Sequence, residues 1–182
     1  MQLLQDKVAI ITGASTGIGR AAAKLFVRHG ARVVVNARGR EGLDSLASEL
    51  GDGAVVLAGD VGDEGTHVQL VALARDRFGG LDVAFNNAGT LGPMQATTEV
   101  DARAWDDALR VNLTAAFFAA KHQIPALSDR GGGSLVFTST FVGHTVGMPG
   151  MAAYSASKAG VLGLVQSLAA ELGPRRIRVN AL

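Results

Sequence analysis

Cysteine is absent from this chain of 182 residues, which excludes disulfide bridges, thiolate nucleophiles and cysteine-ligated zinc sites. Excess charge is also lacking: 17 basic residues against 16 acidic ones leave a net charge of +1, so we expect no nucleic-acid partner. No apolar run reaches the roughly 18 residues that cross a bilayer, and the first residues do not form a cleavable signal peptide. We therefore expect a cytoplasmic protein with no membrane partner and no metal site.

Hydrophobic residues and glycine, in contrast, are abundant. Hydrophobic residues make up 48% of the chain and charged residues 18%, a composition that excludes intrinsic disorder. The length suits a single domain over residues 1–182 with a sizeable core. Glycine occurs 24 times against 4 prolines, and glycine in a folded chain is concentrated at turns and close backbone approaches.

Short apolar runs alternate along the chain with segments of helical periodicity. We expect strands at residues 8–11, 32–35, 54–58, 81–85, 135–137 and 177–179. We expect helices at 18–30, 43–50, 68–78, 101–127 with a break near Pro125, and 153–172. Continuously apolar strands separated by helices are typical of a parallel sheet covered on both faces. The fold class is therefore α/β, a doubly wound parallel sheet of the Rossmann type with six strands.

A glycine-rich turn joins the first expected strand to the first helix. Glycine lets the backbone approach a pyrophosphate, and the helix N-terminus supplies free N–H groups and a partial positive charge. A turn without any ligand is the alternative. We predict a dinucleotide phosphate here, at Gly13-Ala14-Ser15-Thr16-Gly17-Ile18-Gly19.

The same turn also matches G-x-S-x-G, the nucleophile elbow of hydrolases, with Ser15 as the nucleophile. His144 and Asp60 could then complete a triad, although nothing in the sequence links them. An elbow after the first strand leaves no earlier strand–helix loop to supply an oxyanion donor. We therefore place this hypothesis behind nucleotide binding.

The end of the second expected strand indicates which dinucleotide binds. An acidic residue there would accept hydrogen bonds from the ribose hydroxyls of NAD and repel a 2′-phosphate. The sequence instead reads Asn36-Ala37-Arg38, with no acid before Glu41. Arg38 could pair with a 2′-phosphate, so NADP(H) is favoured over NAD(H), and a solvated surface charge is the alternative.

Tyr154 and Lys158 stand four residues apart and so share one face of the last expected helix. Free tyrosine has a pKa of about 10, too high for easy proton transfer at neutral pH. A nearby ammonium favours the phenolate and makes tyrosine a usable general acid or base. Taken alone, the pair also fits an ordinary amphipathic helix.

Four features then occur in order along the chain: the glycine turn, Asn86-Asn87-Ala88-Gly89 after the fourth strand, Asn112 within Val-Asn-Leu, and Tyr154 with Lys158. Together they resemble the short-chain dehydrogenase/reductase family, and the resemblance covers residues from about 6 to 182. It implies hydride transfer between a nicotinamide cofactor and a small-molecule carbonyl or alcohol substrate.

The resemblance also implies residue roles. Tyr154 would pass a proton to or from the substrate oxygen, Lys158 would support the phenolate and hold the nicotinamide ribose, and Asn112 would hold a water behind Lys158. Asp60 and Val61 would contact the adenine. The cofactor-binding set is Gly13, Ser15, Thr16, Gly17, Ile18, Gly19, Arg38, Asp60, Val61, Asn87, Ala88, Gly89, Tyr154 and Lys158.

The catalytic serine of the family has no unambiguous counterpart here. Alignment on Phe141-Val142-Gly143 puts Thr140 at that position, and Thr140 keeps the hydroxyl that polarises the substrate oxygen. Ser139 is the neighbouring candidate, but on a strand its side chain would point to the opposite face. We prefer Thr140.

The chain reaches Asn180-Ala181-Leu182 directly after its last expected strand. Members of the family continue from this point into a mobile substrate lid, another helix and a seventh strand. Without them the nicotinamide end is expected to be partly open to water. A nucleotide-binding fragment without catalysis is therefore the alternative function.

Members of the family commonly assemble as dimers or tetramers through the helices that correspond to residues 102–127 and to the segment carrying Tyr154. Residues 115–120 are apolar around much of a helix, more than one buried face requires. We expect a homo-oligomer, with burial inside the domain as the alternative.

Overall fold

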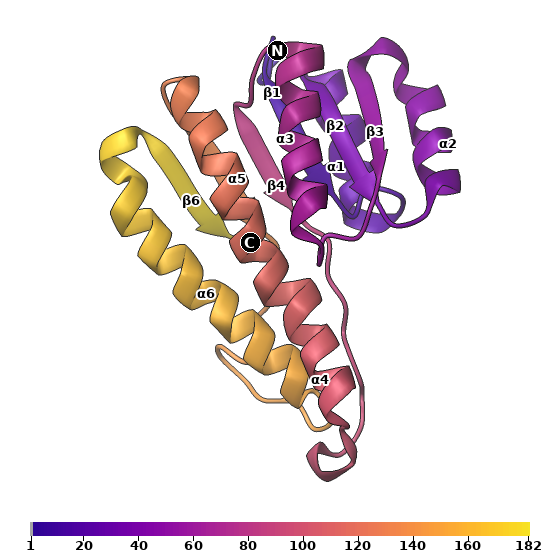
Figure 1. Ribbon diagram of the computed structural model, residues 1–182, viewed down its shortest axis with the longest axis vertical. Coiled ribbons are helices and arrows are strands. Elements are labelled where there is room, and N and C mark those ends of the chain that lie inside the picture. Colours follow the sequence, from indigo (N-terminus) through magenta and orange to yellow (C-terminus); the bar gives the residue numbers. More distant parts are fainter. Residues whose placement is uncertain (1) are drawn as a thin grey trace.

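The computed structural model describes residues 2–182 and places six strands in one sheet, in the order β3-β2-β1-β4-β5-β6 (Figure 1). Every neighbouring pair is parallel. This confirms the expected doubly wound α/β fold. The strands are β1 (Val8–Thr12), β2 (Arg32–Ala37), β3 (Ala54–Ala58), β4 (Val83–Asn86), β5 (Gly133–Phe137) and β6 (Ile177–Ala181).

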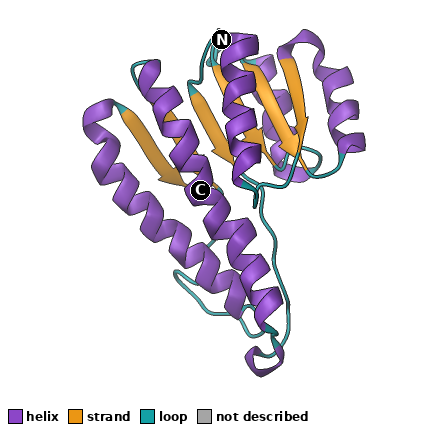
Figure 2. Ribbon diagram, viewed as in Figure 1, coloured by secondary structure: helices purple, strands orange, loops and turns teal. Residues whose placement is uncertain are grey.

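Helices cover both faces of the sheet, as Figure 2 shows. They are α1 (Gly17–Arg28), α2 (Arg40–Leu50), α3 (Glu64–Phe78), α4 (Ala102–Leu109), α5 (Ala115–Asp129) and α6 (Ala152–Leu172). Successive residues of a strand point to opposite faces, so Ile10 packs in the core under α3, α5 and α6, while Ile11 packs in the core under α1 and α2. Among residues 2–182, no helix is long and apolar enough to span a membrane.

The expected helix at 101–127, with its break near Pro125, was wrong in two respects. The interruption lies earlier, at a π-helical turn over Arg110–Thr114 that separates α4 from α5. Pro125 lies inside α5, which continues to Asp129. Pro125 is exposed while Ala126 and Leu127 are buried, so core packing on the inner side holds the helix together despite the missing proline N–H.

The carboxyl ends of all six strands meet at one edge of the sheet. Chain connections leave β1 and β4, which are neighbours, toward opposite faces, and this divergence opens a crevice beyond the two strands. Figure 1 shows α4 and the first turns of α5 and α6 extending beyond this edge. The fold therefore brings the glycine turn and the start of α6 to the same side of the molecule.

Candidate active site

A groove of about 680 Å³ lies along the carboxyl edge of the sheet. Four connections line it: the turn before α1, the ends of β2 and β3, and the segment after β4. Most of the residues that the sequence assigned to a cofactor line this groove, namely Gly13, Ser15, Thr16, Gly17, Ile18, Arg38, Asp60, Val61, Asn87, Ala88 and Gly89. Gly19, Tyr154 and Lys158 do not line it.

The glycine turn is tightly packed against the end of β4. Gly13 and Gly17 have φ values of 66° and 54°, which favour glycine. Gly19 lies beneath the groove, where a Cβ would overlap the Gly13 carbonyl. The Thr12 hydroxyl accepts hydrogen bonds from the Asn87 and Ala88 N–H groups, at 3.0 and 3.1 Å. These contacts leave the N-terminus of α1 facing the groove.

The end of β2 contributes a buried amide and an exposed cation. Asn36 donates hydrogen bonds to the carbonyls of Leu57 and Gly59, at 3.1 and 3.0 Å, and so fixes the end of β3 beside β2. Arg38 is exposed on the groove wall and forms no ion pair with any of residues 2–182. Its guanidinium is therefore free to meet an anionic ligand.

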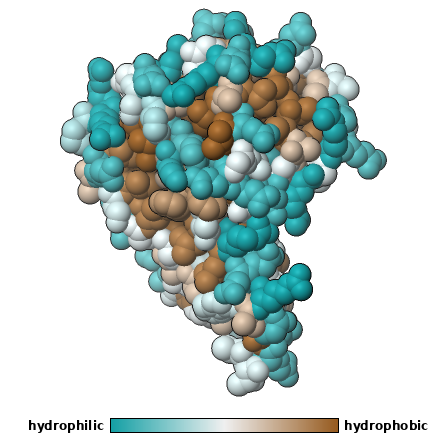
Figure 3. Space-filling view, in the orientation of Figure 1, coloured by the Kyte–Doolittle hydropathy of each residue, from teal (hydrophilic) through white to brown (hydrophobic). Residues whose placement is uncertain are grey.

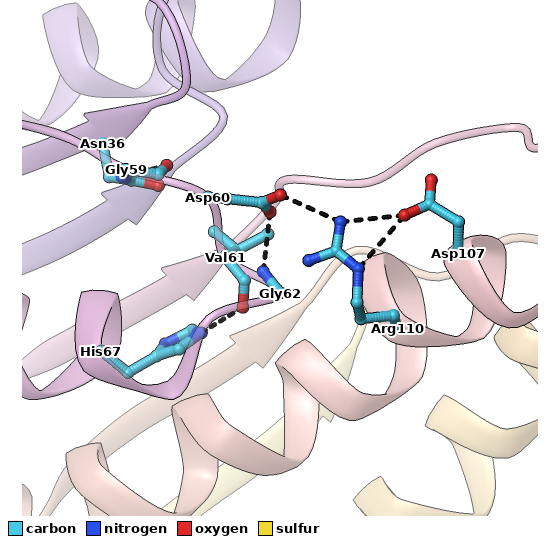
Figure 4. A network of polar contacts seen from close by, with 8 residues as sticks. All are labelled: Asn36, Gly59, Asp60, Val61, Gly62, His67, Asp107 and Arg110. Atoms are coloured by element: carbon cyan, nitrogen blue, oxygen red, sulfur yellow. Dashed lines mark hydrogen bonds and ion pairs between the residues drawn. The ribbon is translucent and has the colours of Figure 1, made fainter.

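The end of β3 carries a polar network that sequence reasoning missed (Figure 4). Arg110 donates to Asp60 at 2.9 Å and to Asp107 at 2.9 and 3.1 Å, and the Asp60 carboxylate also accepts from the Gly62 N–H at 2.8 Å. Burial alone would raise the pKa of Asp60, but these hydrogen bonds and the charge of Arg38 outweigh burial and lower it. Asp60 is thus held as a carboxylate.

His67 is a second residue that the sequence did not reveal. Its Nε2 lies 2.8 Å from the Val61 carbonyl, and because a carbonyl only accepts, Nε2 carries the proton. His67 is fully buried, and burial lowers its pKa, so the ring stays neutral and fixes Val61. The expected helix began only at residue 68, whereas α3 begins at Glu64 and includes His67, and a lone histidine carries no sequence signal for this contact.

Tyr154 and Lys158 lie at the other end of the site, on α6. The Lys158 ammonium is 5.9 Å from the centre of the Tyr154 ring and donates to the Thr138 carbonyl at 2.7 Å. Only 5% of Lys158 is exposed, and this burial lowers its pKa to about 8. A Cβ on Gly89 would lie 3.5 Å from the ammonium nitrogen, so Gly89 connects the groove to Lys158.

Asn112, in the π-helical turn, is buried next to these residues. Its amide oxygen accepts a hydrogen bond from the Thr90 N–H at 2.9 Å. Its amide nitrogen donates to the Thr90 carbonyl at 2.8 Å and to the Ser157 hydroxyl at 2.9 Å. A cavity of about 20 Å³ adjoins Asn112 and Lys158, with room for about one water molecule. Thr12, Asn86, Thr138 and His67 add polar groups to its wall.

The two candidates for the family's serine position lie beyond the end of β5. That strand ends at Phe137, so the expected alternation of side chains along a strand does not apply to Ser139 and Thr140, and that reasoning was wrong. The Thr140 hydroxyl accepts from the Val142 N–H at 3.2 Å. The Ser139 hydroxyl is buried without a hydrogen-bond partner among residues 2–182. Neither side chain lines the groove.

The hydrolase alternative finds no support in this arrangement. Ser15 lies in the groove wall, Asp60 is engaged by Arg110 and Gly62, and His144 is exposed in the loop before α6. Within residues 2–182, none of the three bonds another. No triad is assembled.

Comparison with known proteins agrees with the fold. The pattern of the short chain dehydrogenase family matches residues 7–182, and the chain belongs to this family. It is 35% identical over 180 residues to cyclohexanol dehydrogenase of Acinetobacter sp. (strain SE19), covering 97% of this chain and 71% of that protein. It is 39% identical over 181 residues to (+)-borneol dehydrogenase 1 of Salvia officinalis, covering 98% and 69%.

A solved structure is similarly close. The 3-ketoacyl-ACP reductase from Sinorhizobium meliloti 1021 superposes with a TM-score of 0.92 at 38% identity, over 96% of this chain and 70% of that one. The chain is therefore shorter than its relatives, as the resemblance implied. It is a member of an oxidoreductase family that uses NAD(P)(H).

Proposed function

We propose that this protein transfers a hydride between NADP(H) and a small-molecule carbonyl or alcohol, with Tyr154 as the general acid or base. The observation that carries the proposal is the buried Lys158 ammonium beside the Tyr154 ring, next to Gly89 of the groove that the glycine turn lines. Bound NADP(H) would supply or accept the hydride. Residues of the chain would bind the cofactor, polarise the substrate oxygen and transfer the proton.

The groove fits such a cofactor because its floor leaves no room for side chains. The turn from Gly13 to Gly19 would hold the pyrophosphate at the N-terminus of α1, and Asn87, Ala88 and Gly89 would line the nicotinamide half. Asp60 and Val61 would contact the adenine. The unpaired Arg38 would bind the 2′-phosphate, which is why NADP(H) is proposed over NAD(H).

Proton transfer at Tyr154 depends on the groups around Lys158. With a pKa of about 8, Lys158 is mainly protonated at pH 7, and it therefore places a positive charge beside the Tyr154 ring. One of its three N–H groups bonds Thr138, which leaves donors for the ribose hydroxyls and for a water in the adjoining cavity. Asn112 forms part of the wall that would hold this water.

The substrate oxygen needs a hydroxyl donor besides Tyr154. Thr140 is the proposed residue, because its oxygen accepts from Val142 while its own proton remains free to be donated. Ser139 stays the neighbouring candidate. Two single variants, Thr140→Val and Ser139→Ala, distinguish these candidates. Only the loss of the hydroxyl that polarises the substrate oxygen should lower kcat.

The substrate itself is proposed to be a small apolar secondary alcohol or ketone. Two segments near Tyr154 expose apolar side chains: Leu91 and Met94 on one, and Val146 and Met148 on the other. The Gln95 N–H bonds the Gly150 carbonyl at 3.2 Å and joins the two segments. The names of two relatives, a cyclohexanol and a borneol dehydrogenase, make alicyclic alcohols the first compounds to assay.

Replacement of Tyr154 by Phe tests the proposed reaction. Loss of the phenolic proton should lower kcat by about 100-fold or more, the usual contribution of a general acid or base. The Kd for NADPH, followed by nucleotide fluorescence, should stay near the wild-type value because the groove is intact. Normal turnover in this variant would contradict the assignment of Tyr154.

We also propose that the chain forms a homo-oligomer through α5 and α6. The alanines of the 115–120 segment are mostly buried in the protein's own core, so the apolar run by itself does not require a partner. Phe117 nevertheless remains 50% exposed, and Figure 3 shows apolar surface over α5 and α6. Light scattering should show an oligomer that replacing Phe117 by Ser weakens. The cytoplasmic location stays a prediction.

A further inference from the structure

Arg110 is the first residue of the π-helical turn, and no step proposed above uses it. We propose that Arg110 is a positioning residue that holds the Asp60 carboxylate in place, so that the groove selects adenine over purines that carry a carbonyl in place of the amino group. The inference rests on the proposed nucleotide binding and extends it to the choice of base.

The Arg110 guanidinium is fixed from two sides (Figure 4). Its Nη2 donates to Asp60 Oδ2 at 2.9 Å and to Asp107 Oδ1 at 2.9 Å, and its Nε donates to the same Asp107 oxygen at 3.1 Å. Asp107 lies one helical turn before Arg110 and so sets the direction of the side chain. Because the guanidinium is planar and its donors are rigidly placed, fixing it also fixes the carboxylate that it binds.

Asp60 keeps acceptor capacity after these contacts. Oδ1 accepts from the Gly62 N–H and Oδ2 accepts from Arg110, whereas an ionised carboxylate has about four acceptor positions. The side chain is 30% exposed and lines the groove. An acceptor held there can receive a hydrogen bond from the adenine amino group, whereas the carbonyl of hypoxanthine would face it as a second acceptor.

Gly62 provides the space that this arrangement needs. A Cβ at residue 62 would overlap the Arg110 guanidinium, so any larger residue would push Arg110 away from Asp60. The φ of Gly62 lies outside the left-handed region, and alanine would therefore not strain the backbone. The change Gly62→Ala thus displaces the guanidinium without removing it.

The same π-helical turn holds both ends of the groove. Arg110 donates a hydrogen bond to Asp60 at the end of the groove proposed for adenine. Asn112, two residues later, bonds Thr90 near Lys158. The hydrogen bonds from Arg110 also help to keep the pKa of Asp60 below its usual range, against the effect of burial, so the acceptor stays ionised. Sequence separation hid this contact, because Arg110 and Asp60 are 50 residues apart.

The test measures Kd for NADPH and for its hypoxanthine analogue, and compares the ratio of the two. In the wild-type chain we expect a preference for NADPH of about tenfold, as for a hydrogen bond to a charged group. The variants Arg110→Met and Gly62→Ala should each reduce that ratio several-fold, and Arg110→Lys should restore part of it. Arg103→Met, at an exposed arginine of α4 that lies outside the groove, should leave the ratio unchanged.

Two results would overturn the inference while leaving nucleotide binding intact. One is an unchanged ratio in both Arg110→Met and Gly62→Ala. The other is an equal loss of affinity for both nucleotides, which indicates a merely structural role. If Arg110→Met fails to fold, as judged by its melting curve, Gly62→Ala and Arg110→Lys decide. Wild-type chain that binds neither nucleotide would instead overturn the proposed function and this inference with it.

Discussion

Burial of the Lys158 ammonium costs the folded protein free energy, because the charge leaves water and in return donates one hydrogen bond, to the Thr138 carbonyl. Burial lowers its pKa from 10.5 to about 8. Between these two values the unfolded chain binds a proton that the folded chain does not, so stability rises with pH across this window. Below pH 8 the full cost is present.

Replacing Lys158 by Met should therefore stabilise the protein and abolish its activity. At pH 7 we expect the free energy of unfolding to rise by about 1–2 kcal/mol, the desolvation cost removed less the lost hydrogen bond to Thr138. The advantage should shrink as pH rises from about 8 toward 10.5, because the wild-type amine then becomes neutral in both states. Urea denaturation of both proteins at pH 7, 8.5 and 10 measures the difference; a constant difference across this range would contradict it.

At the level of elements, α6 packs closely against the π-helical turn at Gly160, which has no side chain. A Cβ at Gly160 would lie 2.7 Å from a methyl carbon of Leu113, whereas a Cβ at Gly163 would meet nothing within 4 Å. The two positions are one turn apart in the same helix. Because their surroundings differ, an alanine substitution at each position distinguishes the effect of helix propensity on stability from the effect of packing.

The change Gly163→Ala should stabilise the protein by about 0.5–1 kcal/mol, because alanine loses less backbone entropy in a helix. The change Gly160→Ala should cancel this gain or destabilise by about 1 kcal/mol, because Leu113 has to move within the turn that carries Asn112. Thermal unfolding of the two variants beside wild type provides the comparison. Equal stabilisation by both would show that Leu113 adjusts freely.

The strands were predictable because each is a short apolar run bounded by glycine or polar residues, and a parallel sheet buries both faces of such a run. The break in the 101–127 helix was not predictable. Pro125 is the local signal for a break, but α5 continues through it, and the π-helical turn, whose Asn112 bonds Thr90 and Ser157, has no such signal in the sequence. At Pro125, the packing of Ala126 and Leu127 in the core outweighs the local preference for a break.

The candidate site likewise has a part that could be predicted from the sequence and a part that could not. The turn from Gly13 to Gly19 and the Tyr154–Lys158 pair carry spacing that can be read along the chain. The contacts of Arg110 with Asp60 and of His67 with Val61 have no such pattern, because a charged or polar residue on a helix is usually solvated. The fold brings the start of the π-helical turn to the loop after β3, where Arg110 meets Asp60, and the first turn of α3 places His67 against Val61 in the same loop.

For the molecule as a whole, ligand binding and stability are linked. A nucleotide that binds only the folded state should stabilise it by about 2.7 kcal/mol at 100 times its Kd, which raises the melting temperature by about 5–10 °C for a chain of this size. At equal concentrations, NADPH should raise the melting temperature more than NADH does.

The contribution of Arg38 follows from the same measurement. The change Arg38→Ala should remove most of the difference between NADPH and NADH, while the exposed Arg40, which pairs with Asp44 on α2, provides a matched control in Arg40→Ala. A larger shift with NADH in the wild-type chain would contradict the proposed cofactor preference.

The strand order also determines how the site is assembled during synthesis. β1, β2 and β3 are consecutive in the chain and adjacent in the sheet, and the glycine turn, Arg38 and Asp60 that follow their ends are all synthesised by residue 60. At about 5–20 residues per second, the 94 residues from Asp60 to Tyr154 require on the order of ten seconds. The phosphate and base end of the groove is therefore made first, Asp60 receives its Arg110 partner next, and Tyr154 completes the proton-transfer end last.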